Sequence, residues 1–280
     1  MSKTETEVTA ATAETAPKPA GPPKSVFREY FESFVVTLIM ALFGMTFVIQ
    51  AVTVPTGSMQ NTILVGDYLL VNKFIFAPGG KPVPLLPQRE IQRGDIIVFK
   101  FPGYQDTRGM DAEEIAQAGT PYTTNFVKRV IGMPGETIEF RNSQVYINGE
   151  LSPEHRIIAD SPLDRRNRPN SEAPLVVSSE EPRLENEKYS VYYSKRTADL
   201  PKDYEYGVAG KVTKVPEDSY FVMGDSRDHS LDSRFWGFVH RDLIIGRAMF
   251  VYWSCDRTNS SGAFDCLTNP RLDRIGKFIK

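Results

Sequence analysis

The chain has 280 residues, of which 41% are hydrophobic and 24% are charged, and its formal net charge is −2. This composition is ordinary for a globular protein with a buried core. The slightly negative balance provides no basic surface, so nucleic acid is excluded as an expected partner. Twenty prolines and twenty glycines indicate many turns and favour β structure over long helices.

The N-terminal segment differs in composition from the rest of the chain. Residues 1–25 are rich in Ala, Thr, Pro, Glu and Lys and contain almost no large apolar side chains. Such a segment cannot bury enough surface to offset the entropy lost on ordering. We therefore predict a disordered tail over residues 1–33.

A long uncharged segment follows, running from Phe34 to Val54. Its 21 residues would form a helix of about 31 Å, enough to cross a hydrocarbon layer of about 30 Å. The alternatives are a buried core helix, which is usually shorter and amphipathic, and a cleavable signal peptide. The apolar run is too long for a signal peptide, and Ile49-Gln50-Ala51 is a poor cleavage site. The segment predicts a retained transmembrane anchor over 34–54, with the lipid bilayer as a partner.

The charges that flank this span predict its orientation. Lys18, Lys24 and Arg28 precede it, whereas Lys73 is the one basic residue within about 20 residues after it. Because positive flanks stay on the cytoplasmic side, we expect a cytoplasmic N-terminus and a translocated C-terminal domain.

Beyond the anchor, the chain contains short runs of β-branched and aromatic residues bounded by Gly, Asp or Asn. We predict a mainly β protein with an antiparallel β-sheet domain and a polar insertion, tethered by one N-terminal transmembrane helix. The sheet domain is expected in two parts, 55–150 and 210–254, with Arg141-Asn142-Ser143 turning one hairpin. The remaining predicted segments are a long loop over 103–122, an insertion or satellite subdomain over the polar, proline-dotted residues 151–209, and a C-terminal tail over 255–280.

The sequence contains two cysteines, Cys255 and Cys266. Their spacing is not a zinc pattern, and the chain has no CxxC pair, so no metal site is expected. In an oxidising compartment the two thiols would form a disulfide; otherwise they are unrelated thiols.

A serine lies in a tight turn directly after the apolar span, in Pro55-Thr56-Gly57-Ser58-Met59. A small neighbour lets a substrate approach closely, and this is a common setting for a nucleophile. The alternative is an ordinary turn serine.

Lys128 lies in a strand-like apolar run, between Phe126-Val127 and Val130-Ile131. A lysine in such a run either extends to water or loses its charge. To act as a base near neutral pH, its pKa would have to fall from about 10.4 to roughly 7–8. The alternative is a surface lysine on an edge strand.

A third block, Gly224 to Gly237, mixes acidic, basic and hydroxyl side chains within an otherwise apolar region. The alternative for this block is a solvated loop with weak surface ion pairs.

Together and in this order, these blocks resemble the type I signal peptidase family, also called leader peptidases. The resemblance covers the apolar span and residues 52–75, 93–101, 126–136 and 219–237. It implies a membrane-bound serine endopeptidase that removes signal peptides from exported preproteins and needs neither cofactor nor metal. It also implies that Ser58 is the nucleophile and Lys128 the general base.

The same resemblance implies roles for further residues. Thr56 and the Ser58 backbone N–H would form the oxyanion hole, and Ser230 would hydrogen-bond and orient the lysine. Two sets complete the implied site: the charged supporting residues are Asp225, Asp232, Arg234 and Arg129, and the pocket for small side chains is lined by Met59, Val54, Phe126 and Val127.

The chain departs from the family pattern in two places. Gln60-Asn61-Thr62-Ile63 stands where Pro-Thr-Leu is usual, and loss of that proline is expected to loosen the turn. Ser226 and His229 replace frequent asparagines, which puts substrate preference in doubt. His229 neighbours Ser230, but the family varies there, so we do not expect a histidine triad.

Two other functional classes compete with this interpretation. A Ser–Lys self-cleaving cytoplasmic repressor would need a DNA-binding domain in front of the dyad, where this chain has a tail and an apolar span. A non-enzymatic β module would not need Thr56, Ser58, Lys128 and Ser230. We therefore expect a single-pass protein of a bacterial cytoplasmic membrane with its catalytic domain on the outer face, where a Cys255–Cys266 disulfide is favoured.

Overall fold

A computed structural model describes residues 25–77, 81–104, 119–164, 166–170, 172–195, 206, 210–256 and 265–280. Residues 1–24 of the predicted tail, most of the predicted loop over 103–122 and part of the predicted insertion lie outside these ranges. The chain divides into two units, residues 1–43 and 44–280.

The first unit contains helix α1, Val26–Phe43, in which every side chain is at least partly exposed. A π-helical turn, Gly44–Val48, continues it, and the combined helix is long and apolar enough to cross a membrane. The helix therefore begins before Phe34 and ends before Val54, in contrast to the predicted boundaries.

Residues 49–53, predicted as the end of the span, form strand β1 (Ile49–Thr53) instead. This strand pairs in antiparallel register with β2 (Asp67–Asn72), from Ile49 opposite Asn72 to Thr53 opposite Tyr68. Three of its five residues are β-branched and favour an extended backbone. Its backbone N–H and C=O groups, which a helix would satisfy internally, are paired with those of β2.

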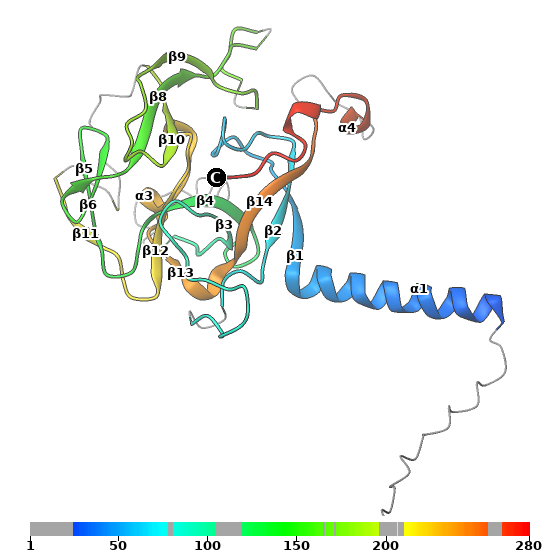
Figure 1. The fold of residues 1–280 in the computed structure, drawn as a ribbon. Helices are drawn as coiled ribbons and strands as arrows, with labels where there is room; N and C mark the ends of the chain where they lie inside the picture. The colour runs from blue at the N-terminus through cyan, green and yellow to red at the C-terminus, as the bar shows by residue number, and fades with distance from the viewer. Residues whose placement is uncertain are drawn as a thin grey trace, which may run out of the picture. The chain divides into compact units, whose positions relative to one another are not determined.

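The second unit is built around a seven-stranded sheet with the order β1-β2-β14-β3-β4-β12-β13 (Figure 1). Every neighbouring pair in this order is antiparallel, as the sequence predicted. The remaining strands of the sheet are β3 (Ile96–Lys100), β4 (Asn125–Gly132), β12 (Ser219–Met223), β13 (Val239–His240) and β14 (Ile244–Ser254).

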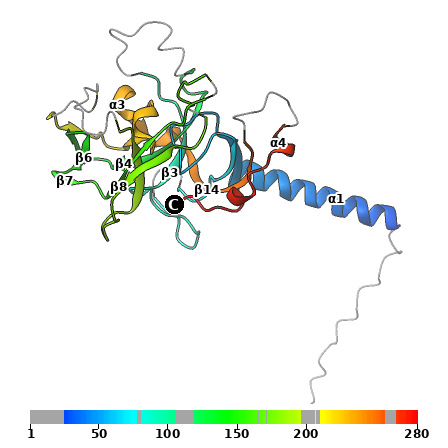
Figure 2. The ribbon, with the colours of Figure 1, turned by 90° about the horizontal axis from the view of Figure 1, so that it is seen from above.

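Two smaller sheets accompany the main one. The first has the order β11-β5-β6-β7, and Figures 1 and 2 show β6 remote from β14. Its β5–β6 hairpin turns at Asn142 and Ser143, both with positive φ. Residues 137–150 were expected in the main sheet but belong to this separate one, whose strands are β5 (Thr137–Arg141), β6 (Gln144–Ile147), β7 (Glu150–Leu151) and β11 (Thr213–Lys214).

The described part of the predicted insertion forms the other small sheet, with the order β10-β8-β9. Its strands are β8 (Glu154–Asp160), β9 (Val176–Glu180) and β10 (Tyr189–Tyr193). The β10–β8 pair is parallel, whereas the other strand pairs of the described residues are antiparallel. Short helical turns complete the described elements: η3 (Arg227–His229), α3 (Ser233–Trp236), η4 (Arg241–Leu243), α4 (Asp265–Thr268) and η5 (Leu272–Arg274).

The C-terminal residues, predicted as a tail, pack against the sheet. The backbone of Ile279 donates to the Met249 carbonyl at 2.8 Å, and its side chain is buried in the cluster that contains Val54 and Met59. Burial of the Ile279 side chain is favourable, and the hydrogen bond to β14 satisfies its backbone N–H.

Candidate active site

Ser58 lies in the turn that follows β1, and its side chain is buried. The turn is closed by backbone hydrogen bonds from Gln60 to Gly57 at 3.0 Å and from Ile63 to Met59 at 2.7 Å. The Ser58 carbonyl accepts a bond from the Ser226 N–H at 3.1 Å, which joins the turn to the Gly224–Gly237 block. At Gly224, a Cβ atom would collide with the Ser58 carbonyl oxygen and the Ser230 side chain, so this close approach requires glycine.

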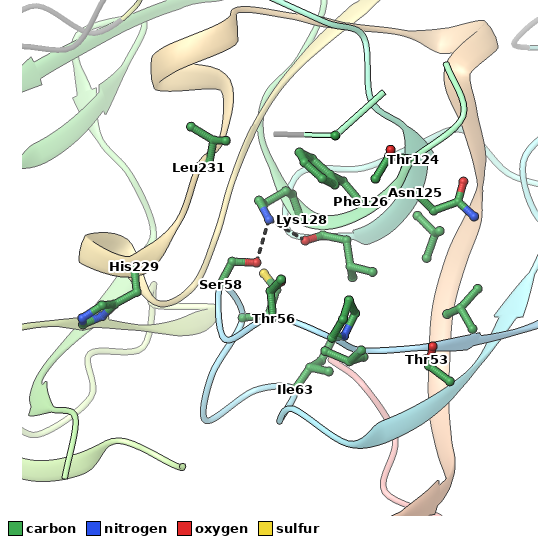
Figure 3. Close-up of a pocket in the computed structure, with 17 residues that line it drawn as sticks. Thr53, Thr56, Ser58, Ile63, Thr124, Asn125, Phe126, Lys128, His229 and Leu231 are labelled. Carbon is green, nitrogen blue, oxygen red and sulfur yellow. Dashed lines mark hydrogen bonds between the residues drawn. The ribbon is translucent and has the colours of Figure 1, made fainter. Parts of the chain in front are cut away.

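Strand β4 brings Lys128 to this turn. Its Nζ lies 2.7 Å from Ser58 Oγ and 3.2 Å from the Val127 carbonyl oxygen, as the dashed lines in Figure 3 show. The Lys128 side chain is 4% exposed, and its Nζ lies 5.2 Å from the centre of the Phe126 ring. The predicted nucleophile and the predicted base are therefore within hydrogen-bond distance of each other in a site shielded from water.

Burial lowers the pKa of Lys128 to about 8, because desolvation disfavours the ammonium form. The charge of Arg234 also lowers this pKa, while Asp232 and Asp225 raise it without restoring the ordinary value. Among the described residues, the hydrogen-bond partners of Nζ are a hydroxyl and a carbonyl, and both are uncharged. With a pKa of about 8, roughly a tenth of Lys128 is neutral at pH 7, far more than for an ordinary lysine, and neutral is the form that a general base requires.

Arg129, the next residue on β4, pairs with Asp225 in a buried two-point contact. Its Nε lies 2.8 Å from Oδ1 and its Nη2 2.7 Å from Oδ2. The pKa of Arg129 is raised, because the Asp225 carboxylate outweighs the opposing effect of burial. Thr62 Oγ1 also donates to Asp225 at 2.6 Å, so the carboxylate links β4 to the turn that carries Ser58.

Asp232 and Arg234 form a second buried pair, with Arg234 Nε 2.7 Å from Oδ1 and Nη2 2.8 Å from Oδ2. Burial raises the pKa of Asp232, but the charge and hydrogen bonds of Arg234 outweigh it, with help from the Gly224 N–H. The resulting pKa is below its usual value. A carboxylate beside the lysine therefore stays ionised.

Ser230 is buried next to this pair, and its hydroxyl donates to Asp232 Oδ2 at 2.7 Å. The resemblance predicted a hydrogen bond from Ser230 to Lys128; within the described residues, the structure gives that hydroxyl to Asp232 instead. A charged acceptor makes a stronger hydrogen bond than a neutral amine, which accounts for the difference. Among the described residues, Lys128 Nζ is hydrogen-bonded to Ser58 and to the Val127 carbonyl and not to Ser230, so the orienting role of Ser230 stays a prediction.

A cavity of about 350 Å³ opens beside Ser58 and Lys128. All four predicted pocket residues, Val54, Met59, Phe126 and Val127, line it, and the exposed Thr56 lies at its edge. The sequence prediction missed other lining residues, namely Val52, Thr53, Pro55, Ile63, Val98, Gly119, Thr124, Asn125, His229 and Leu231. Val98 was findable in principle, because strand β3 pairs it with Val127.

The histidines lie apart from the dyad. The ring of His229 is exposed, with Nδ1 3.4 Å from Ser226 Oγ, and Figure 3 shows it turned away from Ser58 and Lys128. The buried His155 lies between Glu187, 2.9 Å from Nδ1, and Glu180, 3.1 Å from Nε2. No histidine triad forms at Ser58 within the described residues, because the hydroxyl contacts the lysine.

The structure pairs Cys255 with Cys266 as a disulfide. Cys255 follows directly on β14, so this link connects the end of the main sheet to the segment that contains α4.

A buried serine hydroxyl in hydrogen-bond contact with an amine, at the side of an apolar cavity, is the kind of site that a serine hydrolase has. A family model described as "Signal peptidase, peptidase S26" matches residues 27–253, and the chain belongs to this family. It is accordingly a serine endopeptidase.

Individual relatives agree with this assignment. A signal peptidase I from Aquifex aeolicus is 33% identical over 89% of this chain and 97% of its own length. One from Haemophilus influenzae is 31% identical over 92% of this chain and 77% of its own. A solved signal peptidase I from Enterococcus faecalis is 26% identical and covers 57% of this chain and 97% of its own; its TM-score is 0.29, and that superposition carries no weight.

Proposed function

We propose that this chain is a membrane-anchored endopeptidase that removes N-terminal signal peptides from exported preproteins, with Ser58 as nucleophile and Lys128 as general base. The main supporting observation is the 2.7 Å separation between Lys128 Nζ and Ser58 Oγ at the edge of an apolar cavity. The relatives named signal peptidase I support the substrate class.

The dyad works by moving one proton at a time. Neutral Lys128 removes the Ser58 proton as Oγ attacks the scissile carbonyl, and the resulting ammonium protonates the departing amine of the mature protein. The acyl-enzyme then reacts with water, whose proton passes to the neutral amine. Lys128 returns that proton to Ser58 Oγ as the acyl C–O bond breaks and the acid product leaves, which restores both residues. This cycle consumes one water molecule and needs no metal or cofactor.

Thr56 Oγ1 and the Ser58 N–H are the proposed donors to the oxyanion that forms during both steps. The Thr56 side chain is exposed at the cavity edge, where an incoming carbonyl can reach it. One such donor is typically worth about 3–4 kcal/mol of transition-state stabilisation.

The walls of the cavity support a preference for small apolar side chains before the cleaved bond. Val54, Met59, Phe126 and Val127 surround a volume of about 350 Å³ that must hold several substrate residues. A signal peptide ending in Ala-x-Ala is therefore the proposed type of substrate.

The apolar helix from Val26 to Val48 is the proposed anchor. It is followed closely in the chain by the Ser58 turn, so the nucleophile is tethered near the bilayer where the apolar segment of a preprotein also ends. The excess of basic residues before the helix supports a cytoplasmic N-terminus and a catalytic domain outside the cytoplasmic membrane of a bacterium.

A processing assay on a model preprotein with an Ala-x-Ala site tests the dyad. Ser58→Ala and Lys128→Ala are each expected to reduce cleavage by a factor of at least about 10⁴, because nucleophile and base act as one unit. Ser179→Ala removes an exposed hydroxyl on β9 and is the matched control, expected to cleave at the wild-type rate. Normal cleavage by either dyad variant would refute the mechanism, and recovery of the wild-type protein in the soluble fraction of lysed cells would refute the anchor.

A further inference from the structure

The turn that carries Ser58 is hydrogen-bonded to the insertion. Asn61 Nδ2 donates to the Leu175 carbonyl at 3.1 Å, and the Leu175 N–H donates back to Asn61 Oδ1 at 2.9 Å. Next to it, Gln60 Nε2 donates to the Ala173 carbonyl at 2.5 Å. These three bonds, called the turn–insertion contact below, join residues more than a hundred positions apart in the chain.

The turn–insertion contact is made by the two residues that replace the expected proline and threonine. Gln60 is fully buried and Leu175 nearly so, while Asn61 and Ala173 are half-buried, so the contact is partly shielded from water. Side-chain bonds to the insertion hold the turn at the positions where the family has that proline and threonine, and the expected loosening of the turn stays a prediction.

Asn61 is suited to this contact by its backbone conformation. Its φ is 68°, in the left-handed region that asparagine tolerates better than most residues. In this conformation the side-chain amide reaches the backbone of Leu175, just before β9, and pairs with it as a neighbouring strand would.

The other side of the same turn forms the reaction site. Ser58, Met59 and Ile63 line the cavity, and Thr62 donates to Asp225. The same turn thus contacts the insertion through Asn61 and carries the nucleophile at Ser58. Any shift of the turn away from the insertion moves Ser58 relative to Lys128, which is carried on β4 and does not take part in the turn–insertion contact.

We infer that Asn61, assisted by Gln60, is a positioning residue through which the insertion fixes the nucleophile turn against the cavity. This inference rests on the proposed role of Ser58. It gives the insertion a function in catalysis: residues 173–175 supply backbone groups that hold Ser58 at reaction distance from its base. Asn61 does not touch the reacting atoms and acts through the turn.

Asn61→Gly tests the inference with little backbone strain, since glycine adopts a φ of 68° readily and loses all side-chain bonds to Leu175. The matched control is Asn142→Gly, which makes the same change at an exposed, positive-φ position in the β5–β6 turn. Cleavage of the model preprotein is measured together with the fraction of protein whose Ser58 is acylated by a penem probe. This titration counts correctly folded sites.

For Asn61→Gly we expect kcat per titrated site to fall about tenfold while KM stays within about twofold, because displacement by a fraction of an ångström is costly for the reaction. The pH at which activity is half-maximal should change little, because the burial of Lys128 and the charges of Asp232, Arg234 and Asp225, which set its pKa, remain in place. Asn142→Gly should match the wild type in all three measurements.

Two results would overturn the inference. One is a kcat per titrated site within twofold of wild type; the other is a loss found entirely in the fraction of titratable protein, which would indicate a folding role. Ser58→Ala in the same assay separates this inference from the proposed function. If Ser58→Ala is inactive and Asn61→Gly is normal, the inference alone fails; if Ser58→Ala cleaves normally, the proposed function fails.

Discussion

Lys128 and Arg129 are neighbours on β4, and both side chains are almost completely buried, at 4% and 2% exposure. Their surroundings differ sharply. The amine of Lys128 contacts a hydroxyl and a carbonyl, whereas the guanidinium of Arg129 contacts both oxygens of Asp225 and the Gly94 carbonyl. The pKa of Lys128 falls to about 8, while that of Arg129 rises above its usual value.

Burial alone therefore does not decide the charge of a cation; the partner does. Successive residues of a strand point to opposite faces, so one strand can present an amine of lowered pKa to the cavity and a charged guanidinium to the Gly224–Gly237 block. Arginine suits the supporting position because its planar group binds a carboxylate at two points and does not give up its proton. Lysine suits the proposed role of general base because its pKa shifts readily on burial.

The largest expected effect on stability comes from the paired side of the strand. Arg129→Met leaves the Asp225 carboxylate buried without its countercharge, and we expect the free energy of unfolding to fall by about 3–5 kcal/mol. Denaturant unfolding of the purified protein in detergent measures this. Arg168→Met breaks an exposed pair with Asp164 and should change stability by less than about 1 kcal/mol. Equal effects of the two variants would show that the buried pair contributes no more than a surface pair.

Replacing Lys128 is expected to raise the free energy of unfolding, opposite to the effect of replacing Arg129. Wild-type Lys128 deprotonates at about 8 when folded and at about 10.5 when unfolded, so below pH 8 the buried site costs about 3 kcal/mol of stability. Lys128→Met, similar in volume and uncharged, should therefore raise the free energy of unfolding at pH 7 while abolishing activity.

This gain depends on pH in a defined direction. Between about pH 8 and pH 10.5 the unfolded state binds more protons at this lysine than the folded state, so the wild type becomes more stable as pH rises and the advantage of Lys128→Met shrinks. Unfolding curves at pH 7 and pH 10 measure the difference. The exposed Lys214→Met should show no such trend. A lower free energy of unfolding for Lys128→Met at pH 7 would show that burial of the charged amine does not destabilise the folded protein.

The sequence predicted that Ser58 and Lys128 would be the central pair of the site, but it did not predict the hydrogen bonds of the residues around them. Ser58 and Lys128 could be found because the blocks that carry them stand in the order of the type I signal peptidase family, although each pattern alone left an ordinary alternative open. The hydrogen-bond partner of Ser230 could not, because a hydroxyl chooses among acceptors by distance and charge, and both follow from tertiary packing.

The limits of the fold prediction have similar causes. The apolar run to Val54 gave no sign of where the helix ends, since the break depends on β2, which arrives later in the chain to pair with β1. The burial of Ile279 likewise depends on the part of β14 beyond Arg247, where pairing with β3 has ended and Met249 accepts from the Ile279 N–H. The contact of Asn61 with Leu175 joins segments that no local pattern relates.

The smallest expected effect is a shift in the pH profile, and it tests how the two faces of the site interact. In the wild type, activity should rise with pH as Lys128 loses its proton, with a midpoint near 8. The charge of Asp232 raises the pKa of Lys128 and that of Arg234 lowers it. Asp232→Asn removes the larger of the two carboxylate charges that raise this pKa and leaves the charge of Arg234 opposed by Asp225 alone, so the pKa falls and the midpoint moves to lower pH.

Relative rates across the pH range, each normalised to the variant's own plateau, measure this shift independently of any loss in maximal rate. Asp242→Asn, which neutralises a carboxylate on the exposed turn after β13, should leave the midpoint where it is. A midpoint that moves upward in Asp232→Asn would mean that the rate reports a group other than Lys128. The Asp232–Arg234 pair would then stabilise the site without setting the pKa of Lys128.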